Sequence, residues 1–209
     1  MEADVAKIDL RNQLKHLYNP SKKEVSVVDV PAMNFLMIDG EGDPNTSQAF
    51  RDAMEALYAL SYTLKFGLKF GKFSKKTYDY PVMPSEGLWW ADDMSRFLDS
   101  KDLWKWTLMI MQPEFITPAM VEAARQEVAA KKNPVALPKV RLESYHEGLS
   151  AQIMYIGPFA DEGPTIQRLH QFIKDGGHQL RGKHHEIYLS DPRRTAPEKL
   201  KTVIRQPMR

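Results

Sequence analysis

The chain has 209 residues, which is long enough to bury a substantial hydrophobic core without stabilising disulfides or metal ions. It contains no cysteine, which excludes disulfides, thiolate metal sites and thiol nucleophiles and favours a reducing cytoplasm. There are 29 Lys and Arg against 27 Asp and Glu, a balance that argues against a protein that binds nucleic acid by neutralising phosphates. The less ordinary part of the composition is its 4 Trp, 8 Tyr, 9 Phe and 11 Met.

The amino-terminal segment predicts neither export nor membrane insertion. Residues 1–24 carry acids at Glu2 and Asp4 and no apolar run of the signal-peptide type, so we expect a cytoplasmic protein with a short N-terminal extension. The most apolar stretch, residues 54–68, is interrupted by charged residues and a glycine, which is not the pattern of a membrane helix.

The first half of the chain alternates between strand and helix patterns. Two β-rich runs, 25–30 and 34–40, are separated by Pro31 and predict two strands with a tight connection. Apolar residues from Ser47 onwards recur at helical spacing and predict a long amphipathic helix that ends near Gly67 or Gly71. Further strands are predicted at 78–83, 87–91 and 105–111.

The second half repeats this order after a connecting helix. Thr117 followed by Pro118 predicts the start of that helix, at about 117–133. Strands at 140–143 and 151–156, a helix stopped by Gly176, and strands at 183–189 and 201–205 complete the pattern.

The two halves therefore predict a duplicated module. The expected fold class is α+β: a strand-helix-strand-strand module present twice, with antiparallel sheets and helices on one face. Residues 25–209 would form a single domain whose repeats cover about 25–115 and 138–209. A groove between the repeats would be a natural ligand site.

Strand alternation then selects candidate site residues in the run 183–189. It places His185, Ile187 and Leu189 on one face and His184, Glu186 and Tyr188 on the other. The first, more apolar set is expected to meet the helix, which leaves Glu186 on the open side beside an imidazole and a phenol. The alternative is a solvated glutamate at a strand edge.

The tryptophans form a second group of candidates. All four, Trp89, Trp90, Trp104 and Trp106, fall within 18 positions, so some are expected to face a ligand, although packing in the core explains them equally well.

Metal chemistry has little support in the sequence. His185-Glu186 begins like the zinc-protease helix signature, but Leu189 stands where the second histidine would be and the segment has strand character. We therefore expect no metal and no cofactor.

The run GPFADEGPTIQRLHQFI, followed by GHQLRGKHHEIYLSDPRR, resembles the carboxy-terminal half of the GyrI-like small-molecule-binding family. The segments GLWWADD and KWTLMIMQPEF resemble its stand-alone members of similar length. The resemblance implies a pocket at the interface of the two repeats, with aromatic walls and a central glutamate, the position held by Glu186. Family members that regulate transcription carry a preceding DNA-binding module, and none is evident in the extension.

Stand-alone proteins of this kind include cyclopropanoid cyclopropyl hydrolases, which open the cyclopropane of DNA-alkylating natural products and so detoxify them. For this chemistry we expect Glu186 to act as the base and Tyr155, on the strand before the second helix, to donate a hydrogen bond to the ligand or water. Trp89, Trp106 and Tyr188 would stack on a flat ligand, with Trp90 and His184 beside them. Desolvation is expected to raise the pKa of Glu186. Two alternatives remain: a non-catalytic protein that binds or sequesters a xenobiotic, and a protein-binding inhibitor of gyrase.

Overall fold

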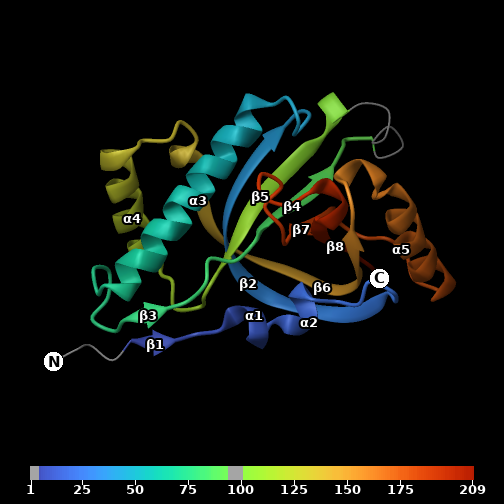
Figure 1. Cartoon of the computed structure of the whole chain (residues 1–209), viewed down its shortest axis with the longest axis horizontal. Helices are drawn as coiled ribbons and strands as arrows, with labels where there is room; N and C mark the ends of the chain where they lie inside the picture. Colours follow the sequence, from blue (N-terminus) through green and yellow to red (C-terminus); the bar gives the residue numbers. More distant parts are fainter. Residues whose placement is uncertain (1–4, 94–100) are drawn as a thin grey trace. The chain divides into compact units, whose positions relative to one another are not determined.

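The computed structural model describes residues 5–93 and 101–209. The chain divides into two compact units that are interleaved along the sequence. The first unit contains Met1–Gln13, Met33–Met83 and Ala91–Tyr145, and the second contains Leu14–Ala32, Pro84–Trp90 and His146–Arg209. Each unit contains helices and strands of its own (Figure 1). In the described parts of the chain, no helix has the length and apolar character needed to cross a membrane.

The first unit is built around helix α3 (Gln48–Lys69). The side chain of Ser47 accepts a hydrogen bond from the backbone N–H of Phe50 and caps the helix. Its apolar stripe, which includes the fully buried Leu57, Leu60 and Leu64, forms the core.

The other elements of the first unit surround this helix. Strand β5 (Lys105–Gln112) pairs antiparallel with the second part of β2 (Ser26–Glu41). Helix α4 (Pro118–Lys131), capped by Thr117, packs against α3. The short strands β1 (Ala6–Lys7) and β3 (Tyr78–Asp79) pair in parallel, and α1 spans Leu10–Gln13.

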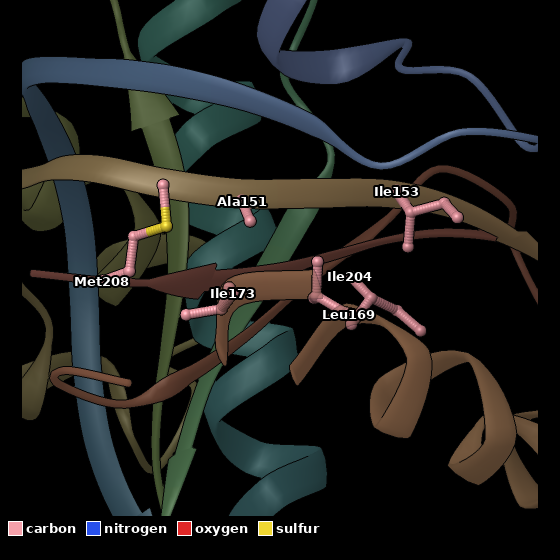
Figure 2. Close-up of a cluster of buried hydrophobic side chains, with 6 residues drawn as sticks. All are labelled: Ala151, Ile153, Leu169, Ile173, Ile204 and Met208. Atoms are coloured by element: carbon pink, nitrogen blue, oxygen red, sulfur yellow. The ribbon is translucent and has the colours of Figure 1, made fainter. Parts of the chain in front are cut away.

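The second unit contains four neighbouring antiparallel strands and helix α5. The strand order is β4 (Ser85–Trp90), β7 (His184–Tyr188), β8 (Lys201–Pro207) and β6 (Arg141–Ile156). Helix α5 (Gly163–Asp175) places Leu169 and Ile173 against this sheet (Figure 2). The short helix α2 (Lys15–Tyr18) also belongs to this unit.

The predicted α+β class, with antiparallel sheets and flanking helices, is confirmed, as are α3, α4 and α5. The two predicted strands around Pro31 are instead one continuous strand, β2. Proline has a φ compatible with extended backbone and lacks only an N–H donor, so it does not have to end a strand. The runs 140–143 and 151–156 likewise belong to one strand, β6.

The strand predicted at 78–83 is limited to Tyr78–Asp79. Pro81 and Pro84 follow, and neither can donate a ladder hydrogen bond. The division into repeats at 25–115 and 138–209 stays a prediction, because the compact units have other, interleaved boundaries.

Candidate functional site

The strand register of the second unit decides which side chains share a face. Residues directly opposite one another in an antiparallel sheet project to the same side. The register aligns one row across all four strands: Gly87, Glu186, Ile204 and Ile153. Ile204 and Ile153 pack against α5 in the buried cluster of Figure 2. Glu186 therefore lies on the face that α5 covers, and the prediction that the helix covers the opposite face was wrong.

The carboxylate of Glu186 is held by its two neighbours on the same face of β7. The Nε2 of His184 lies 3.0 Å from Oε1, and the Tyr188 hydroxyl donates to Oε2 at 2.8 Å. The predicted grouping of His184, Glu186 and Tyr188 on one face is thus what the geometry shows. The Glu186 side chain remains 16% exposed, so it is fixed in position and still reachable from solvent.

Trp89 extends this chain of hydrogen bonds. Its indole Nε1–H donates to the Tyr188 hydroxyl at 3.0 Å, and that hydroxyl donates onward to Glu186. The indole lies back over Gly87, where a Cβ would be 2.6 Å from Trp89 Nε1. Glycine opposite Glu186 therefore makes room for Trp89, and the relay from Trp89 through Tyr188 gives the carboxylate a defined orientation.

The connection from β6 to α5 lies against the same face. Gly157 has a φ of 151° and a Cβ there would be 2.5 Å from the Tyr155 hydroxyl oxygen. That hydroxyl donates to the Pro158 carbonyl at 2.9 Å. Phe159 meets the Tyr188 ring edge to face, with centroids 5.7 Å apart. Tyr155 thus fixes the backbone of this connection, and its predicted role as a donor to a ligand or water stays a prediction.

Electrostatics in the site favour an ionised Glu186. Burial acts to raise the pKa of this carboxyl, but its hydrogen bonds with His184, Tyr188 and Glu162 outweigh burial and hold the pKa below its ordinary value. The expected increase was therefore wrong, because desolvation was considered without the donors. Burial and the adjacent Glu186 raise the pKa of Tyr188 well above its ordinary value, so the phenol stays a donor.

The other face of the same strands carries a fully buried ionic network. His185 Nε2 lies 2.9 Å from Glu86, and its Nδ1 lies 2.9 Å from Glu147. Arg205 approaches Glu147 at 3.0 Å, so two cations face two carboxylates when His185 is protonated. Burial opposes the charge on His185, yet Glu147 and Glu86 raise the pKa of this imidazole to about 9. Burial also opposes the charge on Glu147, but His185 and Arg205 lower the pKa of this carboxyl to about 2.

This network also attaches the segment that contains α2 to the sheet. The Tyr18 hydroxyl donates to Glu86 at 2.6 Å, and Arg205 donates to the Leu17 carbonyl at 2.7 Å. Sequence reasoning missed this network and treated residues 1–24 as an extension. The available signal was the pair of charged residues, His185 and Arg205, at strand positions whose neighbours Ile187 and Val203 are apolar.

The remaining predicted site residues lie elsewhere. Trp106 belongs to the first unit, where it is 1% exposed, lies over Gly40 and meets Phe50 edge to face at 5.4 Å. In the second unit, the Lys183 ammonium lies 3.3 Å from the centroid of the Trp90 ring, a cation–π contact. Ligand stacking on Trp106 and Trp90 therefore stays a prediction.

Within residues 5–93 and 101–209, no three His, Asp or Glu side chains gather in an arrangement suited to a metal ion. The site presents a carboxylate surrounded by hydrogen-bond donors and aromatic rings.

Comparisons with known proteins agree with this description. An uncharacterized conserved protein from Listeria innocua is 39% identical, with a TM-score of 0.90 over 97% of this chain and 100% of its own. A hydrolase from Listeria innocua is also 39% identical, with a TM-score of 0.85 over the same shares. The EcmrR C-terminal domain, at 10% identity and a TM-score of 0.54 over 89% of this chain and 97% of its own, shares the fold. No curated protein matches the sequence.

The family comparison covers nearly the whole chain. The model of the GyrI-like small molecule binding domain matches residues 23–209, a range that includes the carboxylate of Glu186, the relay through Tyr188 and Trp89, and the buried ionic network. The protein therefore belongs to the GyrI-like small-molecule-binding family.

Proposed function

We propose that this member of the family hydrolyses the cyclopropane of flat, cyclopropanoid DNA-alkylating compounds, with Glu186 as the base that positions and activates water. The observation that carries the proposal is the hydrogen-bonding state of this carboxylate. A carboxylate offers about four acceptor positions, and His184 and Tyr188 occupy two of them. The partly exposed side chain therefore keeps acceptor capacity for a water molecule.

The reaction requires only a weak base. In such substrates the cyclopropane is conjugated to a dienone and is already electrophilic. The water oxygen forms a bond to the ring carbon, one cyclopropane C–C bond breaks, and its electron pair moves to the distant carbonyl oxygen, giving a phenolate. Glu186 receives the proton from the water, and the phenolate takes up a proton to become a phenol, so the product is the substrate plus one water.

A lowered pKa of Glu186 is compatible with this mechanism. Glu186 is ionised at neutral pH, so it can order a water molecule without first losing a proton. It is a weaker base than a carboxylate with a raised pKa, and the strained ring compensates because it is reactive on its own. Holding water and the electrophilic carbon in contact then supplies most of the acceleration.

Aromatic groups beside Glu186 supply the binding surface in this proposal. The rings of Tyr188 and Phe159 and the indole of Trp89 adjoin the carboxylate, and such rings bind flat apolar molecules. Since Trp89 and Tyr188 also orient Glu186, ligand contact and orientation of the base would be coupled.

Non-catalytic binding is the second candidate. A carboxylate among aromatic rings also attracts large flat cations through charge pairing and cation–π contact, and the half-buried Glu186 provides that charge. The hydrolase designation of a 39% identical Listeria protein supports turnover over binding alone.

The deciding experiment is product analysis. The purified protein is incubated with a cyclopropane-bearing duocarmycin analogue, and the mass spectrum is searched for the gain of one water. Glu186→Gln is expected to abolish this gain and retain binding, whereas Glu198→Gln, at an exposed glutamate on Pro197–Lys199, should leave it unchanged. Tight binding without any hydrated product would establish the binding protein and reject the hydrolase.

A further inference from the structure

A second carboxyl group, that of Glu162, lies in the site and has no role in the reaction described above. Glu162 is the residue before helix α5 and is only 4% exposed. Its side chain makes no capping hydrogen bond to its own helix, although glutamate at this end of a helix is surrounded by free N–H groups. The side chain is instead engaged with the Glu186 carboxyl by a hydrogen bond.

The backbone around Glu162 is fixed independently of that contact. Tyr155 donates to the Pro158 carbonyl, Phe159 packs on Tyr188, and the Glu162 carbonyl accepts from Ile166 at 3.0 Å in the first turn of α5. Glu162 is therefore held on the same face of the sheet as Glu186 by contacts that do not depend on its own charge.

Two carboxylates cannot hydrogen-bond to each other unless one of them carries a proton, and two like charges in contact under burial disfavour double ionisation. The neighbours decide where the proton resides. Glu186 accepts from His184 and Tyr188, and acceptance of two such bonds stabilises its ionised form. The proton then belongs to the other carboxyl.

We infer that Glu162 is a carboxylic acid that donates a hydrogen bond to the Glu186 carboxylate, so that the two glutamates share one proton and act as a singly ionised pair. Glu162 is thus a positioning residue for Glu186. The inference deepens the proposed function and rests on it for its catalytic consequence, but the shared proton itself can be measured without any turnover.

Other titratable groups near the pair come from β7, from α5 and from the turn before α5. His184 and Tyr188 lie on β7, and His170 of α5 interacts electrostatically with His184. Asp161, beside Glu162, acts on Tyr155. On β4 and β8, the residues that lie opposite Glu186 and Tyr188 are uncharged: Ser85, Gly87, Thr202 and Ile204.

The direct test is a carbon-13 NMR titration of protein labelled at glutamate side chains. The resonance missing from Glu162→Gln assigns Glu162, and the one missing from Glu186→Gln assigns Glu186. At pH 7 the wild type should show Glu162 as an acid and Glu186 as a carboxylate, and Glu162 should become ionised at lower pH once Glu186 is replaced. Two ionised carboxylates at pH 7 in the wild type would overturn the inference, whether or not the protein is an enzyme.

Turnover of the cyclopropane probe supplies the second readout. Glu162→Gln retains an N–H donor toward Glu186 and should keep kcat within about threefold, whereas Glu162→Met has similar length and no donor and should lower kcat about tenfold or more with little change in KM. Equal loss in both variants would reject a hydrogen-bonding role. If the wild type fails to hydrate the probe, the proposed function falls and the NMR result still decides the shared proton.

Discussion

Replacement of His185 by glutamine tests the buried ionic network through the pH dependence of stability. His185 lies between Glu86 and Glu147, which raise its pKa to about 9 in the folded protein. An unfolded chain has an ordinary histidine pKa of about 6.5. The folded state therefore binds the proton more tightly, and this contribution is fully present below about pH 6.5 and is lost as the pH rises through about 9.

The gap between these two pKa values corresponds to about 3 kcal/mol. Urea denaturation followed by circular dichroism should show that the wild type loses about this much free energy of unfolding between about pH 6 and 9. The variant should lack this slope. At pH 7 it should also be less stable by about 3 to 5 kcal/mol, because the two carboxylates lose a buried cation.

The matched control is His146→Gln, at an exposed histidine in the same unit. It should keep both the stability and the slope of the wild type. If His185→Gln and the wild type lose stability in parallel over this pH range, the bridging imidazolium is not the source of the effect and the reasoning is refuted.

Two further substitutions test the packing of Trp89 over Gly87 and the hydrogen bond from Tyr18 to Glu86. Gly87→Ala would place a Cβ 2.6 Å from Trp89 Nε1, so we expect a stability loss of about 1 to 3 kcal/mol in urea denaturation and altered tryptophan fluorescence. Gly163→Ala, where a Cβ meets no atom within 4 Å, is the control and an equal loss there would contradict the steric argument. Tyr18→Phe removes the 2.6 Å donor to buried Glu86 and should lower the unfolding free energy by about 1 to 3 kcal/mol, and an unchanged urea midpoint would show that this bond contributes nothing.

The helices of this protein could be predicted from local sequence because their signals are local. Ser47 and Thr117 cap α3 and α4, and the apolar period fixes the face that each helix buries. Strand boundaries have no such local signal, because an internal proline such as Pro31 is compatible with an extended chain and only long-range pairing shows whether the strand continues.

The sequence by itself determined which side chains of β7 share a face, since alternation in a strand is a property of the backbone. It therefore grouped His184, Glu186 and Tyr188 correctly. It could not determine which face the helix covers, because this depends on the register with β8, where Ile204 lies opposite Glu186.

Only the tertiary structure decided the electrostatics of the site. The donors to Glu186 include Glu162, and the partners of His185 are Glu86 and Glu147, all distant from β7 in sequence. Burial alone would raise the pKa of the Glu186 carboxyl, and hydrogen bonds with His184 and Tyr188 on the same strand, together with Glu162 brought close by folding, reverse that direction. Composition indicated a surplus of aromatic residues, strand alternation and the family resemblance indicated Glu186, and the folded chain determined that this glutamate is ionised and oriented by hydrogen bonds.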